Sequence, residues 1–319
     1  MTADNNGRKG GGKAGNAFRP ARPHDGQKGG AFKGGRPPQG GRRPPRPQGM
    51  EARAVAVDLV DGVQKGRLLD ALLDKGSAAE RYQRLDPRDR GLARAIVGYA
   101  LRRHGQIDDA VGRFLTRPLP DDAGTLKAVI AVSVAQIMFM DVADHAAVAL
   151  GVELAGADKA AVPFKGVVNA VLRRVSENKA AILAEQDAIT LNTPAWLMER
   201  WSANYGADVA RDIAAMNAFE PTLDLTVKSD PEGWAARLGG VKLPNGSVRL
   251  PVTGAVEKID GYEEGGWWVQ DAAATLPVHL LGDVKGKKVV DLCAAPGGKT
   301  AQLAALGADV TAIDVSYHR

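Results

Sequence analysis

The sequence predicts a multidomain protein in which an all-α domain is followed by a small α+β segment and then by the start of an α/β domain. Apolar residues recur with helical period from Met50 to about Ala215, whereas Leu223–Val227 alternates like a strand. Further along, an apolar run, a Pro-Gly-Gly turn and a helical run follow one another. These changes of pattern divide the chain into residues 1–49, 50–180, 181–265 and 266–319.

The first 49 residues form a basic tail that we expect to be disordered. They hold 13 Gly and 7 Pro interleaved with 11 Lys and Arg, against two acidic residues. Such a stretch cannot bury enough apolar surface to offset its conformational entropy. It is either a solubilising tail or an electrostatic tether to RNA whose attraction to phosphate is unspecific and salt-sensitive. We favour the tether.

Composition limits the class of protein. The net charge is +5, but 31 basic and 35 acidic residues remain from Met50 onward, so the folded part is not basic as a whole. A single cysteine excludes a disulfide framework and suits a reducing compartment. The sequence has no signal-peptide core and no run of about 18 apolar residues. We therefore expect a cytoplasmic monomer without membrane contact, and the five scattered histidines predict no metal site.

The second segment, residues 50–180, has the pattern of a helical domain. Two short repeats place valine and leucine on single helix faces, at Val55, Leu59 and Val63 and at Val167, Val171 and Val175. Asp86-Pro87 and Asp144 are expected helix starts, because a carboxylate at the N-cap accepts hydrogen bonds from unpaired amides. The longest stripe predicts one buried helix face at Leu126, Val129, Ile130, Ser133, Val134, Ile137 and Met138.

The third segment, residues 181–265, is predicted to hold linker helices and a small α+β unit. One helix is expected around Lys179–Leu191, and Thr193-Pro194 opens another. Pro231–Leu238 has the pattern of a short helix, and Asn245-Gly246 supplies a turn.

The residues that join this unit to the last segment have expected structural roles. Trp267 and Trp268 would point to opposite faces of a strand, so at most one can stack on a base, and core packing is favoured. Gln270 and Asp271 precede a helical run that they are expected to cap.

A glycine loop is the most informative pattern of the last segment. A strand over Lys287–Leu292 is followed by Pro-Gly-Gly, a helix over Lys299–Leu306 and a second strand that ends in Asp314. Glycines let the backbone approach a ligand, the helix N-terminus favours an anionic group, and an acid after the second strand suits a ribose. The pattern fits a nucleotide or nucleoside site, or a purely structural turn. A Walker A loop is excluded because Cys293 stands where its first glycine belongs, and G-x-G-x-x-G is absent.

Residues Asp291 to Thr300, DLCAAPGGKT, resemble the S-adenosylmethionine loop of RNA cytosine-5 methyltransferases of the RsmB (Sun) and Nop family. Several further segments are similar to the NusB-like domain and the connecting region of the RsmB type. The resemblance covers Met50 to Arg319. These segments begin at Asp89 (DRGLA), Leu101 (LRR), Pro118 (PLP), Asp144 (DHAAV), Lys165 (KGVVNAVLRR), Leu191 (LNTPAWL) and Trp268 (WVQD).

The resemblance implies a NusB-like RNA-binding domain and a Rossmann-like domain that methylates carbon 5 of a cytosine in 16S, small-subunit ribosomal RNA. It implies S-adenosyl-L-methionine as cofactor, with Asp314 accepting from the ribose hydroxyls. We interpret Cys293 as a small residue beneath the loop whose backbone faces the cofactor. The other residues implied to line the cofactor are Ala294, Ala295, Pro296, Gly297, Gly298 and Lys299.

The family's catalytic cysteines are not matched in this sequence. In the family, one thiolate attacks carbon 6 of the cytosine and a second cysteine, after a proline, assists release, and both follow later strands. Carbon 5 is a poor nucleophile until carbon 6 is covalently saturated. We therefore assign no catalytic residue and expect the nucleophile beyond residue 319, in a chain truncated early in the methyltransferase domain and inactive as it stands.

The alternative function is a non-catalytic NusB-like RNA-binding module, in which the helical domain and the tail act alone. A coding sequence that continues past Arg319 into a Pro-Cys pair and a second cysteine favours the enzyme; a stop codon favours the module. Two arginine pairs, Arg102-Arg103 and Arg173-Arg174, are interpreted as solvated helix faces. The resemblance to NusB adds RNA contact as a second interpretation for them.

Overall fold

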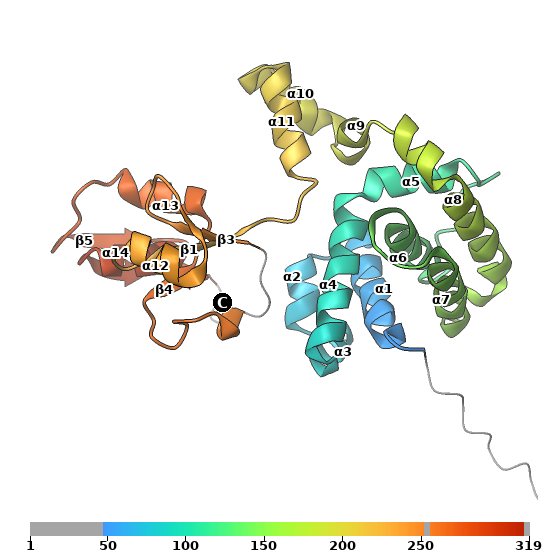
Figure 1. The fold of residues 1–319 in the computed structure, drawn as a ribbon, viewed down its shortest axis with the longest axis horizontal. Coiled ribbons are helices and arrows are strands. Elements are labelled where there is room, and N and C mark those ends of the chain that lie inside the picture. Colours follow the sequence, from blue (N-terminus) through green and yellow to red (C-terminus); the bar gives the residue numbers. More distant parts are fainter. Residues whose placement is uncertain (1–46, 252–255, 316–319) are drawn as a thin grey trace, which may run out of the picture. The chain divides into compact units, whose positions relative to one another are not determined.

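The computed structural model describes residues 47–251 and 256–315, and Figure 1 shows their helices and strands. The basic tail expected over residues 1–49 therefore lies almost entirely outside the described residues. Within the described ranges, no helix is both long and apolar enough to cross a membrane.

The N-terminal part of the described chain is entirely helical, as the periodicity predicted. The last of its helices runs as one element through the boundary predicted at residue 180. A short 3-10 turn, Val162–Phe164, precedes that helix. The helices are α1 (Met50–Gln64), α2 (Leu69–Asp74), α3 (Ser77–Arg84), α4 (Pro87–Arg102), α5 (His104–Gly112), α6 (Leu126–Phe139), α7 (Asp144–Ala157) and α8 (Lys165–Glu185).

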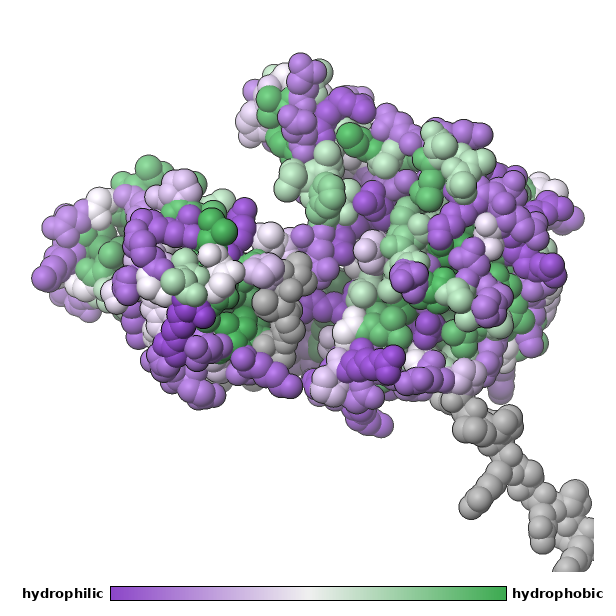
Figure 2. Space-filling model, in the orientation of Figure 1, coloured by the Kyte–Doolittle hydropathy of each residue, from purple (hydrophilic) through white to green (hydrophobic). Residues whose placement is uncertain are grey.

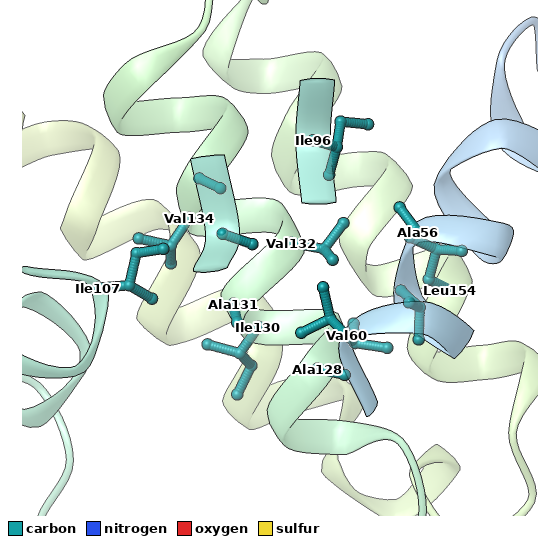
Figure 3. Close-up of a cluster of buried hydrophobic side chains, with 14 of the residues drawn as sticks. Ala56, Val60, Ile96, Ile107, Ala128, Ile130, Ala131, Val132, Val134 and Leu154 are labelled. Carbon is teal, nitrogen blue, oxygen red and sulfur yellow. The ribbon is translucent and has the colours of Figure 1, made fainter. Parts of the chain in front are cut away.

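Helix α6 is the centre of this domain and packs against α1, α4, α7 and α8. All residues of the predicted stripe are buried, but so are Ala128, Ala131, Val132 and Ala135 between them. The predicted stripe is therefore confirmed as buried, and the burial extends beyond it because a helix that is apolar on nearly every side is buried on nearly every side. Figure 3 shows side chains of α1, α4, α5 and α7 gathered around this helix.

Helix α8 is buried on a face one residue away from the predicted one. Val171 and Val175 are buried as expected, but Val167 is 38% exposed and Val168 is fully buried. The buried positions are thus 168, 171, 172 and 175, which follow the i, i+3, i+4, i+7 spacing of a helix. Strict i+4 steps drift off a face, since four residues exceed one turn of 3.6.

The two predicted helix starts differ in how they are capped. Asp86 is the N-cap of α4, its carboxylate accepts from the Asp89 amide at 2.8 Å, and Pro87 fills the first turn, as predicted. Asp144 begins α7, but the N-cap is Ala143. The Asp144 carboxylate instead accepts from the Ser176 hydroxyl of α8 at 2.9 Å, so its predicted capping role was wrong.

Three short helices follow α8, and the first of them is held firmly on α5. These are α9 (Ala188–Asn192), α10 (Ala195–Tyr205) and α11 (Ala207–Met216). A Cβ atom on Gly105 of α5 would lie 1.7 Å from the Leu191 carbonyl oxygen, so only glycine allows this approach. The amide of the buried Gln106 donates to Asn192 Oδ1 at 3.1 Å, and Asn192 Nδ2 donates back to Gln106 Oε1 at 2.9 Å.

The α+β segment forms a four-stranded antiparallel sheet with the order β2-β3-β1-β4. Leu225, Val248, Leu250 and Trp267 form its core with Ala235 of the helix. Asn245-Gly246 makes the predicted turn, and β4 extends the sheet past the boundary predicted at residue 265. The elements are β1 (Leu223–Val227), α12 (Pro231–Leu238), β2 (Val241–Lys242), β3 (Val248–Leu250), a 3-10 turn (Val256–Lys258) and β4 (Trp267–Val269).

The last elements reproduce the predicted order of helix, strand, glycine loop, helix and strand. β5 and β6 pair in parallel from Lys288 opposite Asp309 to Asp291 opposite Ala312. Their core is small, with Val278, Val284 and Leu303 buried at its centre. The elements are α13 (Ala272–His279), β5 (Lys288–Asp291), α14 (Gly298–Ala305) and β6 (Asp309–Ala312).

The buried face of α8 can be tested with two neighbouring valines, Val167 and Val168. Val168→Ala is expected to lower the free energy of unfolding by about 2 kcal/mol, because it removes two buried methyl groups and leaves a cavity. The matched change Val167→Ala should stay within about 0.5 kcal/mol of the wild type. Urea unfolding followed by far-ultraviolet circular dichroism measures both free energies of unfolding, and equal losses of stability would contradict this assignment of the buried face.

Candidate functional site

The glycine loop connects the carboxyl end of β5 to the first turn of α14. Gly297 has a φ of 105° and is the N-cap of α14, a conformation that side-chain-bearing residues rarely adopt. Its amide donates to the Ala294 carbonyl at 2.6 Å, which closes a tight turn just before the helix. The first amides of a helix have no partner within the helix, so the turn presents them to a ligand at this end.

Two carboxylates at the ends of the parallel strands hold the loop in place. Asp291 of β5 accepts from the Thr300 hydroxyl of α14 at 2.8 Å and from the Cys293 amide at 3.4 Å. Asp314, just after β6, accepts from the Ala295 amide at 2.9 Å. The acid predicted for the second strand therefore lies beside the middle of the loop.

A buried glutamine supports the helical side of the loop. Gln270, 6% exposed, lies so close to Gly298 that an added Cβ would be 3.3 Å from its amide carbon. Its Nε2 donates to Gln302 Oε1 of α14 at 3.3 Å, and the Trp268 indole N–H donates to its Oε1 at 2.8 Å. Gln270 thus packs against α14 and links it to β4.

A second tie runs from the sheet to α13 through Asp224 of β1. Its side chain is 2% exposed and accepts from Arg249 Nε at 2.7 Å and Nη2 at 2.8 Å. The Ala272 amide at the start of α13 donates to the same carboxylate at 3.1 Å. The hydrogen bonds from Arg249 are the main cause of a lowered pKa at Asp224, and the Ala272 amide acts in the same direction against the effect of burial.

The structure groups most of the residues that the sequence analysis assigned to a cofactor. The loop residues from Ala294 to Lys299 are contiguous, and Asp314 contacts them through Ala295. Cys293 is exposed, so its expected position beneath the loop was wrong. It lies two residues after the end of β5, where the chain leaves the strand pair.

Several neighbouring roles were also predicted, and others were missed. Asp271 caps α13 by accepting from the Ala273 and Ala274 amides, and Trp267 is buried in the sheet core, both as expected. The clamp by Asp291 and the support by Gln270 were not assigned. The clamp could have been predicted from a threonine nine residues after a strand-end aspartate. The support by Gln270 could not, because it depends on a contact between segments 28 residues apart, which has no sequence signal.

The arrangement suits a ligand with polar or anionic groups and a ribose. Backbone amides, the start of a helix and a strand-end carboxylate are the groups with which α/β folds hold nucleotides. Among the described residues, no cluster of three His, Cys, Asp or Glu side chains is placed to hold a metal ion.

Comparison with known proteins finds a family match for the helical part and relatives that match most of the chain. The NusB family matches residues 50–177, which cover α1 to most of α8. Ribosomal RNA small subunit methyltransferase B of Cronobacter sakazakii is 30% identical over 288 residues, or 85% of this chain and 65% of that protein. The protein of the same name from Citrobacter koseri is 32% identical over 284 residues, or 84% of this chain and 64% of its own length. The chain thus spans somewhat less than two thirds of these relatives.

A solved structure shares the fold over the same extent. The crystal structure of PH0851 superposes with a TM-score of 0.56 at 18% identity, covering 85% of this chain and 64% of that one. Fold and site therefore define a NusB-domain protein that carries a glycine-loop α/β unit. The NusB match and these relatives together support the RsmB (Sun) type family, that of ribosomal RNA small subunit methyltransferase B.

The tie at Asp224 gives a pH-dependent prediction. Asp224→Asn is expected to lower the free energy of unfolding by about 1–3 kcal/mol at neutral pH, because it weakens a buried, charged hydrogen-bond acceptor. A carboxyl whose pKa is lowered on folding stabilises the protein above its unfolded pKa, about 3.9, and loses that contribution as the pH falls through the folded value. The difference from the wild type should therefore shrink below about pH 4.

Urea unfolding followed by tryptophan fluorescence measures this difference, since Trp267 is buried in the same sheet. The control is Glu232→Gln, which removes an exposed ion pair with Lys242 and should cause no measurable change. A difference between wild type and Asp224→Asn that persists unchanged at low pH would contradict the role of the charge.

Proposed function

We propose that the glycine loop binds S-adenosyl-L-methionine. The observation that carries this proposal is the joint placement of loop and acid: Asp314 lies against the Ala295 amide, beside the turn closed by Gly297. The cofactor needs a close backbone approach for its methionine part and a carboxylate for its ribose, and these residues offer both. Once bound, the cofactor supplies the methyl group.

In this proposal each part of the loop has a distinct role. Residues Cys293 to Lys299 line the methionine and ribose side through their backbone, and Asp314 accepts from the ribose hydroxyls. Asp291 positions the loop through Thr300, and Gln270 fixes the start of α14. The strand-loop-helix-strand order supports a Rossmann-like domain, which holds its ligand at the carboxyl ends of parallel strands.

We further propose that the family function to which this chain contributes is methylation of carbon 5 of a cytosine in small-subunit ribosomal RNA; the thiolate that this chemistry needs is not assigned to a residue of this sequence. The relatives are named as ribosomal RNA small subunit methyltransferases, and the NusB family match covers the helical domain. That domain has its own extensive core, so its fold does not depend on the glycine loop. In this proposal it binds the RNA. Cys293 is not the nucleophile in this proposal, because it belongs to the cofactor loop.

A non-catalytic RNA-binding module remains the second candidate. The observation that favours it is the NusB match itself, since the helical core of residues 50–182 is complete without the later sheet. The two candidates differ in whether the glycine loop binds cofactor and in whether the RNA is modified.

Cofactor binding is tested by calorimetry with S-adenosylmethionine on the purified chain. Asp314→Ala is expected to weaken binding by about 10- to 100-fold, as loss of a charged hydrogen-bond acceptor does. Asp309→Ala, at the other, exposed end of β6, and Cys293→Ala should bind like the wild type. A wild-type chain without measurable affinity, or equal affinity in Asp314→Ala, would contradict the proposed site.

Methylation is tested in the organism that encodes the protein. Deleting the gene is expected to remove one 5-methylcytosine from small-subunit ribosomal RNA, read by bisulfite sequencing, because no other enzyme modifies that position in this proposal. The wild-type gene should restore the mark, and a gene with Asp314→Ala should not. An unchanged methylation map after deletion would favour the RNA-binding module.

A further inference from the structure

A hollow on the helical side of the molecule has no role in the glycine loop or its supports. It has a volume of about 320 Å³ and lies where the end of α4 meets α9, α10 and the residues after α11. Small-molecule sites have volumes of about 300 to 1,000 Å³, so a single nucleotide unit is within its range.

The two sides of the hollow are held together by close packing. The approach of Gly105 to the Leu191 carbonyl and the paired hydrogen bonds between Gln106 and Asn192 fix α9 on α5. Gln106 Nε2 also donates to Gln186 Oε1 at 3.0 Å, which ties the end of α8 to the same point. The α9 wall of the hollow is therefore fixed before any ligand binds, which lowers the entropic cost of binding.

The charge of the hollow is positive. Arg102 and Arg103 line it, and its lining includes no Asp or Glu. The Arg102 guanidinium lies 5.9 Å from the Tyr99 ring centre and the Arg103 guanidinium 5.6 Å from that of Phe139, which orients both. Arg103 Nη1 donates to Gln106 Oε1 at 3.2 Å, but its Nε is buried without a hydrogen-bond partner in the described part of the chain. Guanidinium groups that line a hollow favour an anionic ligand such as a phosphate.

The rest of the lining is largely apolar and aromatic. Trp201 of α10 and Phe219 after α11 contribute rings, and Phe219 is 63% exposed. Figure 2 shows apolar residues among the hydrophilic ones at the surface in this part of the molecule. Met216 and Val209 of α11 are both exposed. Flat rings beside guanidinium groups are the combination that holds unstacked bases of single-stranded RNA.

We propose that this hollow binds one unstacked nucleotide of single-stranded RNA. The base packs against the rings of Trp201 and Phe219, and the phosphate lies at Arg102 and Arg103. The inference rests on the proposed function in that RNA is the partner, but it concerns residues far along the chain from the glycine loop. Two guanidiniums without a lining carboxylate, together with two rings, favour RNA over an acidic peptide.

The test uses a short single-stranded oligoribonucleotide that carries one 2-aminopurine. We expect it to bind the wild type with a change of anisotropy and with quenched 2-aminopurine fluorescence, because the base stacks on a ring. Phe219→Ala should weaken binding at least about fivefold and reduce the quenching. Arg102→Gln should weaken binding and lower its dependence on salt.

Matched controls separate the hollow from exposed surface in general. Trp196→Ala removes an equally exposed ring on α10 outside the lining, and Arg88→Gln removes an exposed arginine at the other end of α4. Both should bind RNA like the wild type. Phe219→Ala and Arg102→Gln should keep the affinity of the wild type for S-adenosylmethionine, which shows that they remain folded.

Three outcomes overturn the inference. The first is that Phe219→Ala and Arg102→Gln bind the oligoribonucleotide as tightly as Trp196→Ala and Arg88→Gln. The second is that all four weaken it equally, and the third is that the wild type does not bind it. In each case calorimetry with S-adenosylmethionine still decides the cofactor site, so failure of the hollow and failure of the proposed function are distinguishable.

Discussion

The burial of helix α6 on almost every side, with Lys127 as its one exposed residue, is the constraint on which the helical domain depends. An apolar helix with no polar face must be covered all round, and here α1, α4, α7 and α8 cover it. Its few polar side chains are satisfied within the core: Gln136 donates to the Val132 carbonyl at 2.9 Å and accepts from Arg53 Nε at 2.7 Å. Phe139, the last residue of α6, is only partly buried and stacks on Tyr99 of α4. The burial of one helix thus places the two guanidiniums that lie beside these rings.

The C-terminal elements are held by a different kind of interaction. Their two hydrophobic clusters have few fully buried members, whereas one large cluster extends through the helical domain. Buried polar side chains supply much of the connection between them, through Asp224 with Ala272 and Gln270 with Gln302. Hydrogen bonds are directional and their loss leaves a buried group unpaired, so such ties fix geometry more strictly than apolar contact does. This geometry holds the start of α14 beside the glycine loop.

Features that depend on residues near each other in the sequence were predictable, and features that depend on contacts with distant segments were not. The cap at Asp86, the strand β1, the turn at Asn245-Gly246 and the strand-loop-helix order of the site depend on residues within one or two turns of each other. The face of α8 was placed one residue off because the neighbouring helices, not the valine spacing, decide which side is covered. Cys293 was expected beneath the loop from its type alone, and exposure depends on what packs above it. Gln106 gave no signal, because its partner lies 86 residues away. Gln270 was expected only to cap α13, and its contact with Gln302 was missed because that partner lies 32 residues away.

The proposed hollow and the proposed loop have different roles: the hollow contributes affinity for RNA, and the loop holds the methyl donor. The lining of the hollow offers rings and guanidiniums, which bind any base and any phosphate, but few groups that distinguish one base edge from another. A site of this composition contributes affinity and register along an RNA strand rather than sequence choice. In the proposed function, the selection of one cytosine then requires contacts at the reacting base or recognition of RNA shape. The proposed hollow would accordingly position the RNA strand, and the proposed cofactor loop would serve the methyl transfer.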